Sequence, residues 1–125
     1  MLADPAQLRR WSFGTWEAVV SADGLIEGRA IFDGSVSFVR VDSDARRGTI
    51  HYLIGPDRQA LQPRIVFHVV PGDRLGRSAA GCVLTMLAWR AAGMDDERWR
   101  RLTAGHEFEA VLIKALLENP GAALR

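Results

Sequence analysis

The chain lacks most of the features that would assign a protein to a class at sight. Its 125 residues contain one cysteine, Cys82, which excludes an internal disulfide framework and a metal cage built from cysteines alone. No apolar run approaches the roughly 20 residues of a membrane span, and Met1–Arg10 lacks the basic-then-apolar order of a signal peptide. The single thiol fits a reducing compartment, so we expect a cytoplasmic protein.

An excess of either charge is also missing. The 16 Lys and Arg residues face 15 Asp and Glu residues, which leaves a net charge of +1 and argues against a nucleic-acid partner. Every basic residue except Lys114 is arginine, a bias typical of a GC-rich bacterial genome. The alternative is selection for bidentate anion binding, but arginines such as Arg46, Arg58 and Arg77 are scattered along the sequence.

What is present indicates one compact domain. Hydrophobic residues make up 48% and charged residues 25% of the chain, which is typical of a globular protein. The length suits a single domain spanning residues 1–125. The aromatic residues are expected mostly in its core, and Cys82 is expected as an inert buried thiol.

The first two-thirds of the chain predict a short helix followed by strands. Asp4-Pro5 predicts a helix start over Pro5–Arg10, and Asp23-Gly24 and Asp33-Gly34 are tight-turn signals. Six runs with strand character follow the helix: Thr15–Ser21, Leu25–Phe32, Val36–Val41, Thr49–Ile54, Ile65–Val70 and Cys82–Trp89.

The last segment changes to a helical period. Asp95 and Asp96 offer an N-cap, and Asn119-Pro120-Gly121 ends the pattern. Between them, one apolar stripe recurs at three- and four-residue steps: Trp99, Leu102, His106, Ala110, Ile113 and Leu117. The whole pattern predicts an α+β fold in which a curled antiparallel sheet of about six strands grips a long C-terminal helix.

Two parts of the sequence resemble a known family. Gly81–Met86, Ala91–Trp99, His106 and Leu112–Glu118 resemble the ending of bacterial polyketide-cyclase-like proteins, where the last strand passes through a Gly-Met-Asp-Asp-Glu-like turn into the long helix. Leu2–Trp16 resembles the end of their second short helix and the start of their second strand. These proteins belong to the START-related, helix-grip superfamily (SRPBCC), and the resemblance implies a cavity between sheet and helix.

The chain departs from this family at its beginning. Helix-grip domains usually start with a strand and a first helix before the segment that Leu2–Trp11 resembles, and this sequence has no residues for them. Either native residues precede Met1, or the first strand is absent and one sheet edge is unpaired. An unpaired edge invites another chain, so we expect a homodimer through it.

The candidate ligand-binding residues come from the expected concave face. Arg64, Val66, His68 and Val70 share one face of a strand if alternation is regular, Thr49, His51 and Leu53 share one face of another, and His106 interrupts the helix stripe. Such a mixed wall is typical of a small-molecule pocket, although each residue has the alternative of a solvent face or a core position. The candidates are His51, His68, His106, Trp11, Phe38, Trp99 and Arg64.

Three functions remain open at this point. The first is binding of a small hydrophobic ligand, such as a lipid or an aromatic polyketide-like compound, without a cofactor. The second is a cyclase, aromatase or dehydratase in which a cavity histidine moves a proton or Arg64 orients an enolate. The third is a ligand-free interaction protein with a filled interior. The sequence contains no closely spaced pair of histidines of the kind that would indicate a metal site.

Overall fold

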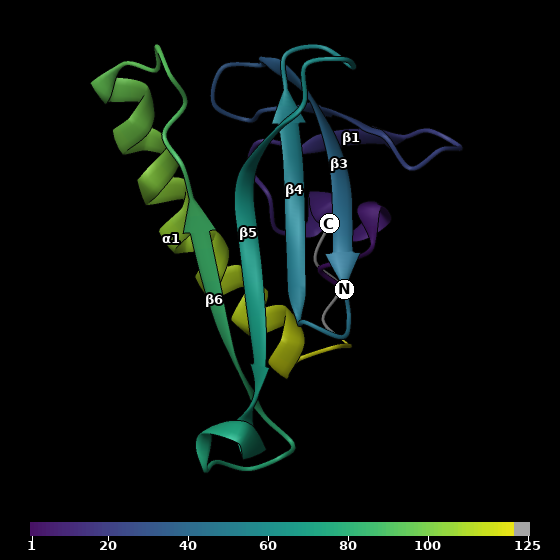
Figure 1. Cartoon of the computed structure of the whole chain (residues 1–125). Helices are drawn as coiled ribbons and strands as arrows, with labels where there is room; N and C mark the ends of the chain where they lie inside the picture. The colour runs from purple at the N-terminus through teal and green to yellow at the C-terminus, as the bar shows by residue number, and fades with distance from the viewer. Residues whose placement is uncertain (122–125) are drawn as a thin grey trace.

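A six-stranded antiparallel sheet and a long helix make up most of the protein. The computed structural model describes residues 1–121, and its elements follow each other as η1 (Pro5–Arg10), β1 (Glu17–Val20), β2 (Ile26–Arg29), β3 (Val36–Asp44), β4 (Thr49–Gly55), β5 (Gln62–Pro71), η2 (Gly72–Leu75), β6 (Cys82–Ala88) and α1 (Asp96–Glu118) (Figure 1). The predicted α+β fold is confirmed.

The strands lie in the sheet in the same order as in the sequence. Each strand pairs antiparallel with the next, from β1 to β6. Short turns make this meander possible, and Gly24, Gly34 and Gly48 adopt positive φ angles of 85°, 70° and 70° in the first three of them. The sheet is therefore open, with β1 at one edge and β6 at the other.

The ends of α1 are set by local chemistry. The Asp95 carboxylate accepts a hydrogen bond of 2.7 Å from the Arg98 backbone N–H and so caps the first turn. The negative charges of Asp96 and Glu97 in that turn interact favourably with the positive end of the helix dipole. The helix ends at Glu118, and Asn119 donates its side-chain amide to the carbonyl of Ala115 at 3.0 Å. The helix predicted from the sequence is confirmed at both ends.

The core lies between one face of the sheet and the helix that crosses it (Figure 1). The alternation of side chains along the strands places these buried residues on that face: Ile26, Val39, Ile50, Tyr52 and Phe67. The opposite side of the core is formed by residues of the N-terminal segment and of α1: Leu2, Leu8, Trp11, Ile113 and Leu116.

Trp11 anchors the N-terminal segment to the sheet. Its indole makes edge contacts with Tyr52 and Phe67, with ring centroids 5.8 Å and 5.6 Å apart. The buried Tyr52 hydroxyl donates to the carbonyl of Leu2, and burial raises the pKa of Tyr52. The segment before β1 thus closes one end of the space between sheet and helix.

A bulge interrupts the pairing of β4 and β5. Tyr52 pairs with Ile65, but the next pair is Leu53 with Pro63, so Arg64 is an extra residue in β5. Beyond a bulge, the residues that point to a given face of the sheet are shifted by one position along the strand. Arg64 therefore points to the same side of the sheet as Ile65, although regular alternation would separate them.

Two expectations about burial are wrong. Cys82 is exposed, because it opens the edge strand β6 instead of an interior one. Several aromatic side chains are also exposed: Trp16, Phe32, Trp89 and Phe108. Within residues 1–121, no helix has the length and apolar character needed to cross a membrane.

Candidate functional site

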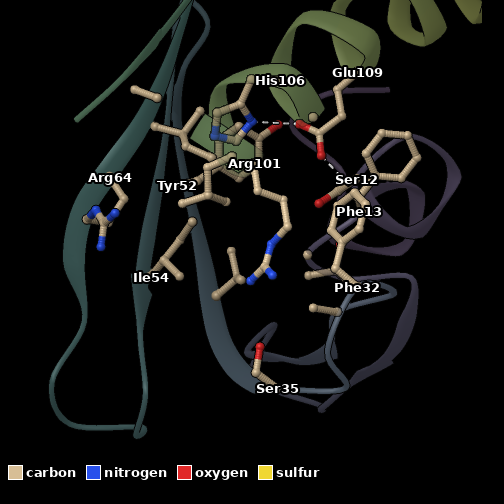
Figure 2. Close-up of a pocket in the computed structure, with 18 of the residues that line it drawn as sticks. Ser12, Phe13, Phe32, Ser35, Tyr52, Ile54, Arg64, Arg101, His106 and Glu109 are labelled. Carbon is tan, nitrogen blue, oxygen red and sulfur yellow. Dashed lines mark hydrogen bonds and ion pairs between the residues drawn. The ribbon is translucent and has the colours of Figure 1, made fainter. Parts of the chain in front are cut away.

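A cavity of about 160 Å³ lies between the inner face of the sheet, the segment before β1 and the first half of α1. Its wall is largely apolar and aromatic and includes Trp11, Val39, Tyr52, Ile54 and Leu102. Figure 2 shows Tyr52 and Ile54 on the sheet side, with Phe13 and Phe32 across from them. An apolar hollow with a few polar groups is the usual form of a small-molecule site.

A hydrogen-bonded pair of side chains forms part of the wall of this cavity. His106 and Glu109 stand one turn apart on α1, and His106 Nδ1 lies 2.8 Å from Glu109 Oε2 (Figure 2). Glu109 Oε1 accepts a second bond of 2.8 Å from the Phe13 backbone N–H, and Glu109 is only 3% exposed. The carboxylate therefore ties the helix to the segment before β1.

This geometry assigns the histidine tautomer. An ionised carboxylate only accepts hydrogen bonds, so the proton that it shares with His106 sits on Nδ1. In the neutral imidazole, Nε2 is then left as an acceptor and a base. A carboxylate that orients a histidine in this way is the arrangement used in general-base sites.

Two other polar groups in the cavity wall have no partner. The Trp11 indole N–H and the Thr15 hydroxyl are buried without a hydrogen bond to any described residue, and each side chain is 2% exposed. An unsatisfied buried group costs about 1–3 kcal/mol. Both atoms have almost no accessible surface, so they lie behind the surface of the cavity.

Three arginines line the cavity as well. Arg101 pairs with Asp33 at 3.1 Å and lies over the Phe32 ring, 5.8 Å from its centroid. Arg64 donates from Nη2 and Nε to the carbonyl of Trp89, at 3.1 Å and 3.3 Å. The third is Arg98, near the start of α1.

An aromatic cluster forms one side of the opening. The Phe13 ring stacks on Trp16 and Phe108 with centroid distances of 6.3 Å and 6.0 Å, and it meets the edge of Phe32 at 5.8 Å. Gly105 of α1 lies below these rings, and a Cβ placed there would meet Phe13 at 3.6 Å. The partial exposure of Phe32 and Phe108 shows that the cluster faces solvent.

The structure brings together four of the seven candidate residues. His106, Trp11, Trp99 and Arg64 all line the cavity. Glu109 was missed, and its only sequence signal is its position three residues after His106 on the same helix face.

The expected inward placement of the other three is wrong. His51 lies between the inward-facing Ile50 and Tyr52, and its side chain points to the opposite face. His68 is exposed and pairs with Thr85 on that outer face. Phe38 also faces outward, where the Arg58 guanidinium lies 5.0 Å from its ring centroid. The bulge at Arg64 explains the error in β5, because it separates Arg64 from the face of Val66 and His68.

A second hollow adjoins the first. A wide groove of about 940 Å³ lies between β6 and α1, with Leu84 and Met86 on one side and Ala110 and Leu117 on the other. Trp99 and His106 border both the groove and the cavity. Among residues 1–121, no group of three His, Cys, Asp or Glu side chains is placed to hold a metal ion.

Comparisons with protein-family models, curated proteins and solved structures find nothing that matches this chain. The resemblance to the helix-grip superfamily therefore stays a prediction.

Proposed function

We propose that this protein binds a small, largely apolar molecule in the cavity between its sheet and α1. The observation that carries the proposal is the cavity of about 160 Å³ itself, whose largely apolar and aromatic wall also holds a few polar side chains, among them His106 and Glu109. A ligand-free interaction protein would instead have a filled interior.

The volume of the cavity narrows the class of ligand. An apolar cavity of about 150 Å³ holds a benzene molecule, and this one measures about 160 Å³. We therefore propose a ligand with a single aromatic ring inside the cavity. A fatty acid or a multi-ring polyketide would have to extend into the groove beside β6.

Calorimetric titration with phenol and with a C12 fatty acid tests the size of the ligand. Ile54 lines the cavity, so Ile54→Phe fills part of it and should weaken phenol binding about tenfold or more. The matched control is Ile31→Phe, at an exposed position outside the cavity. Failure of phenol to bind, or equal binding by the two variants, would overturn the proposal, and binding of the fatty acid alone would move the site to the groove.

A second candidate, proton transfer, is favoured by the His106–Glu109 pair. A base at Nε2 in the cavity wall suits removal of a proton next to a carbonyl, the first step of cyclase and dehydratase chemistry. The C–H bond breaks, its electron pair forms the enolate, and the proton moves to Nε2. An arginine of the wall, such as Arg64, is the candidate for holding the enolate oxygen.

Deuterium exchange into the methyl group of acetophenone tests this candidate without knowledge of the substrate. In D₂O, the protein should speed the exchange seen by NMR, and His106→Gln should remove about 10²-fold or more of the acceleration, the usual contribution of a general base. Exposed His68→Gln is the matched control. Exchange at the buffer rate, with acetophenone shown to bind, would reject the enzyme and leave the binding function intact.

We also propose that the chain forms a homodimer through the edge strand β6. Natural edge strands are usually protected by charges, proline or bulges, but Cys82–Ala88 contains neither a charged residue nor a proline. A two-fold antiparallel pairing centred on Thr85 would place Val83 against Leu87 and Leu84 against Met86 of the second copy. The strand is thus complementary to itself, as a two-fold interface requires.

A reducing cytoplasm remains our prediction for the location of the protein, supported by the exposed, unpaired thiol of Cys82.

A further inference from the structure

We infer that the ligand of the cavity is an anion: a single-ring aromatic carboxylate whose carboxylate group lies against the guanidinium groups of Arg64, Arg98 and Arg101. The inference rests on the proposed binding function and adds the charge of the ligand to it. Three basic side chains from two elements, β5 and α1, meet at this one cavity.

The acidic groups of the cavity wall do not balance these arginines. The wall contains two carboxylates, Asp33 and Glu109. Glu109 is occupied by His106 and by the Phe13 N–H. Asp33 accepts from Arg101 at 3.1 Å and from the Ser35 N–H at 2.9 Å. Hydrogen bonds from Ser35 and the charges of Arg101 and Arg98 lower the pKa of Asp33. Arg98 thus interacts with Asp33 through its charge but makes no ion pair with it, and Arg64 has no acidic partner among residues 1–121.

Of the three arginines, Arg64 has the environment that most favours an anion beside it. It is half-buried, and its guanidinium donates only to the Trp89 carbonyl among the described residues. Loss of hydration lowers the pKa of Arg64, and the neighbouring charge of Arg98 lowers it further. A partly buried charge is normally paired, so the half-buried guanidinium of Arg64, with the exposed Arg98 near it, indicates a site for an anion.

Arg98 adds to this indication. Its guanidinium makes no hydrogen bond or ion pair with any of residues 1–121, and its backbone N–H alone is used, by the Asp95 cap. Figure 2 shows Arg101 extending between Ile54 and Phe32, with Arg64 on the sheet side of the same space. A planar carboxylate accepts two parallel bonds from a guanidinium, a geometry that suits arginine better than lysine.

His106 offers a second polar contact in the same cavity. Its Nδ1 is engaged by Glu109, so Nε2 of the neutral ring is an acceptor. A hydroxyl group on the aromatic ring can donate to it, and 4-hydroxybenzoate is therefore a suitable probe.

Calorimetry with 4-hydroxybenzoate and with its neutral analogue 4-hydroxybenzamide tests the charge. The carboxylate should bind about tenfold or more tightly than the amide, and its affinity should fall as salt is added. Arg98→Gln should remove most of this difference. Arg64→Gln serves as a second variant for the half-buried position. The control is Arg100→Gln, an exposed arginine on the same helix outside the cavity.

The outcomes separate this inference from the function on which it rests. Equal binding of amide and carboxylate, or a difference that survives Arg98→Gln and Arg64→Gln, overturns the anion site and keeps the binding function. Failure of both probes and of phenol to bind overturns the binding function and the anion site together.

Discussion

At the scale of single residues, Glu109 links the most distant parts of the site. It is a buried carboxylate whose two oxygens each accept one hydrogen bond, from Phe13 and from His106. A charged acceptor makes stronger hydrogen bonds than a neutral one, and it also determines which nitrogen of His106 carries the proton. Glu109 is thus a positioning residue, and its effect on any reaction passes through His106.

Replacement of Glu109 by glutamine should change the tautomer of His106. The amide oxygen of Glu109→Gln can still accept from Phe13, and its NH₂ group then donates to His106 Nδ1. The ring proton moves to Nε2, and the base in the cavity is lost. Ring ¹⁵N chemical shifts measure this switch, and urea unfolding should show a loss of about 1 kcal/mol, because a charged acceptor is replaced by a neutral one.

Exposed Glu107→Gln, on the same helix, is the control for that change and should affect neither measurement. An unchanged tautomer in Glu109→Gln would show that another group orients the imidazole.

The secondary-structure elements differ in how much of them was predictable. The bounds of α1 follow from caps and periodicity that are local in sequence, and the meander follows from short turns between apolar runs. The inward face of β5 was not predictable, because the bulge at Arg64 arises from pairing with β4. Glu109 was missed because its partner Phe13 lies 96 residues away, and no local pattern reports that contact. The same holds for the arginines, which are scattered in sequence and meet only in the fold.

Within α1, replacement of Gly105 by alanine is expected to stabilise the protein. Glycine in a helix costs about 1 kcal/mol relative to alanine, and a Cβ at Gly105 would meet Phe13 and Phe32 at 3.6 Å and 3.9 Å, which is ordinary contact. Gly105→Ala should therefore raise the free energy of unfolding in urea by about 0.5–1 kcal/mol. The reverse change at the exposed neighbour, Ala104→Gly, should lower it by a similar amount. A loss of stability in Gly105→Ala would mean that the rings of the aromatic cluster cannot move to accommodate the added methyl group.

At the scale of the whole molecule, the groove lies between the cavity and the β6 edge of the sheet. Ala88, Trp99 and His106 border both the cavity and the groove, and the inner residues of β6 line the groove. A second copy paired with β6 would extend the sheet at this side. Assembly and ligand entry are therefore expected to influence each other through the groove.

The dimer is tested by placing a charge at its two-fold axis. Thr85 is exposed in the middle of β6, and antiparallel pairing of two copies would set Thr85 directly against its equivalent. In Thr85→Lys, two like charges would oppose each other across the strands, which destabilises the pairing. Sedimentation equilibrium should show a dimer for the unchanged protein and a monomer for the variant. His68→Lys places the same charge on the same face but one strand inward, and it should stay dimeric. A monomer for the unchanged chain, or a dimer for both variants, would exclude β6 as the interface.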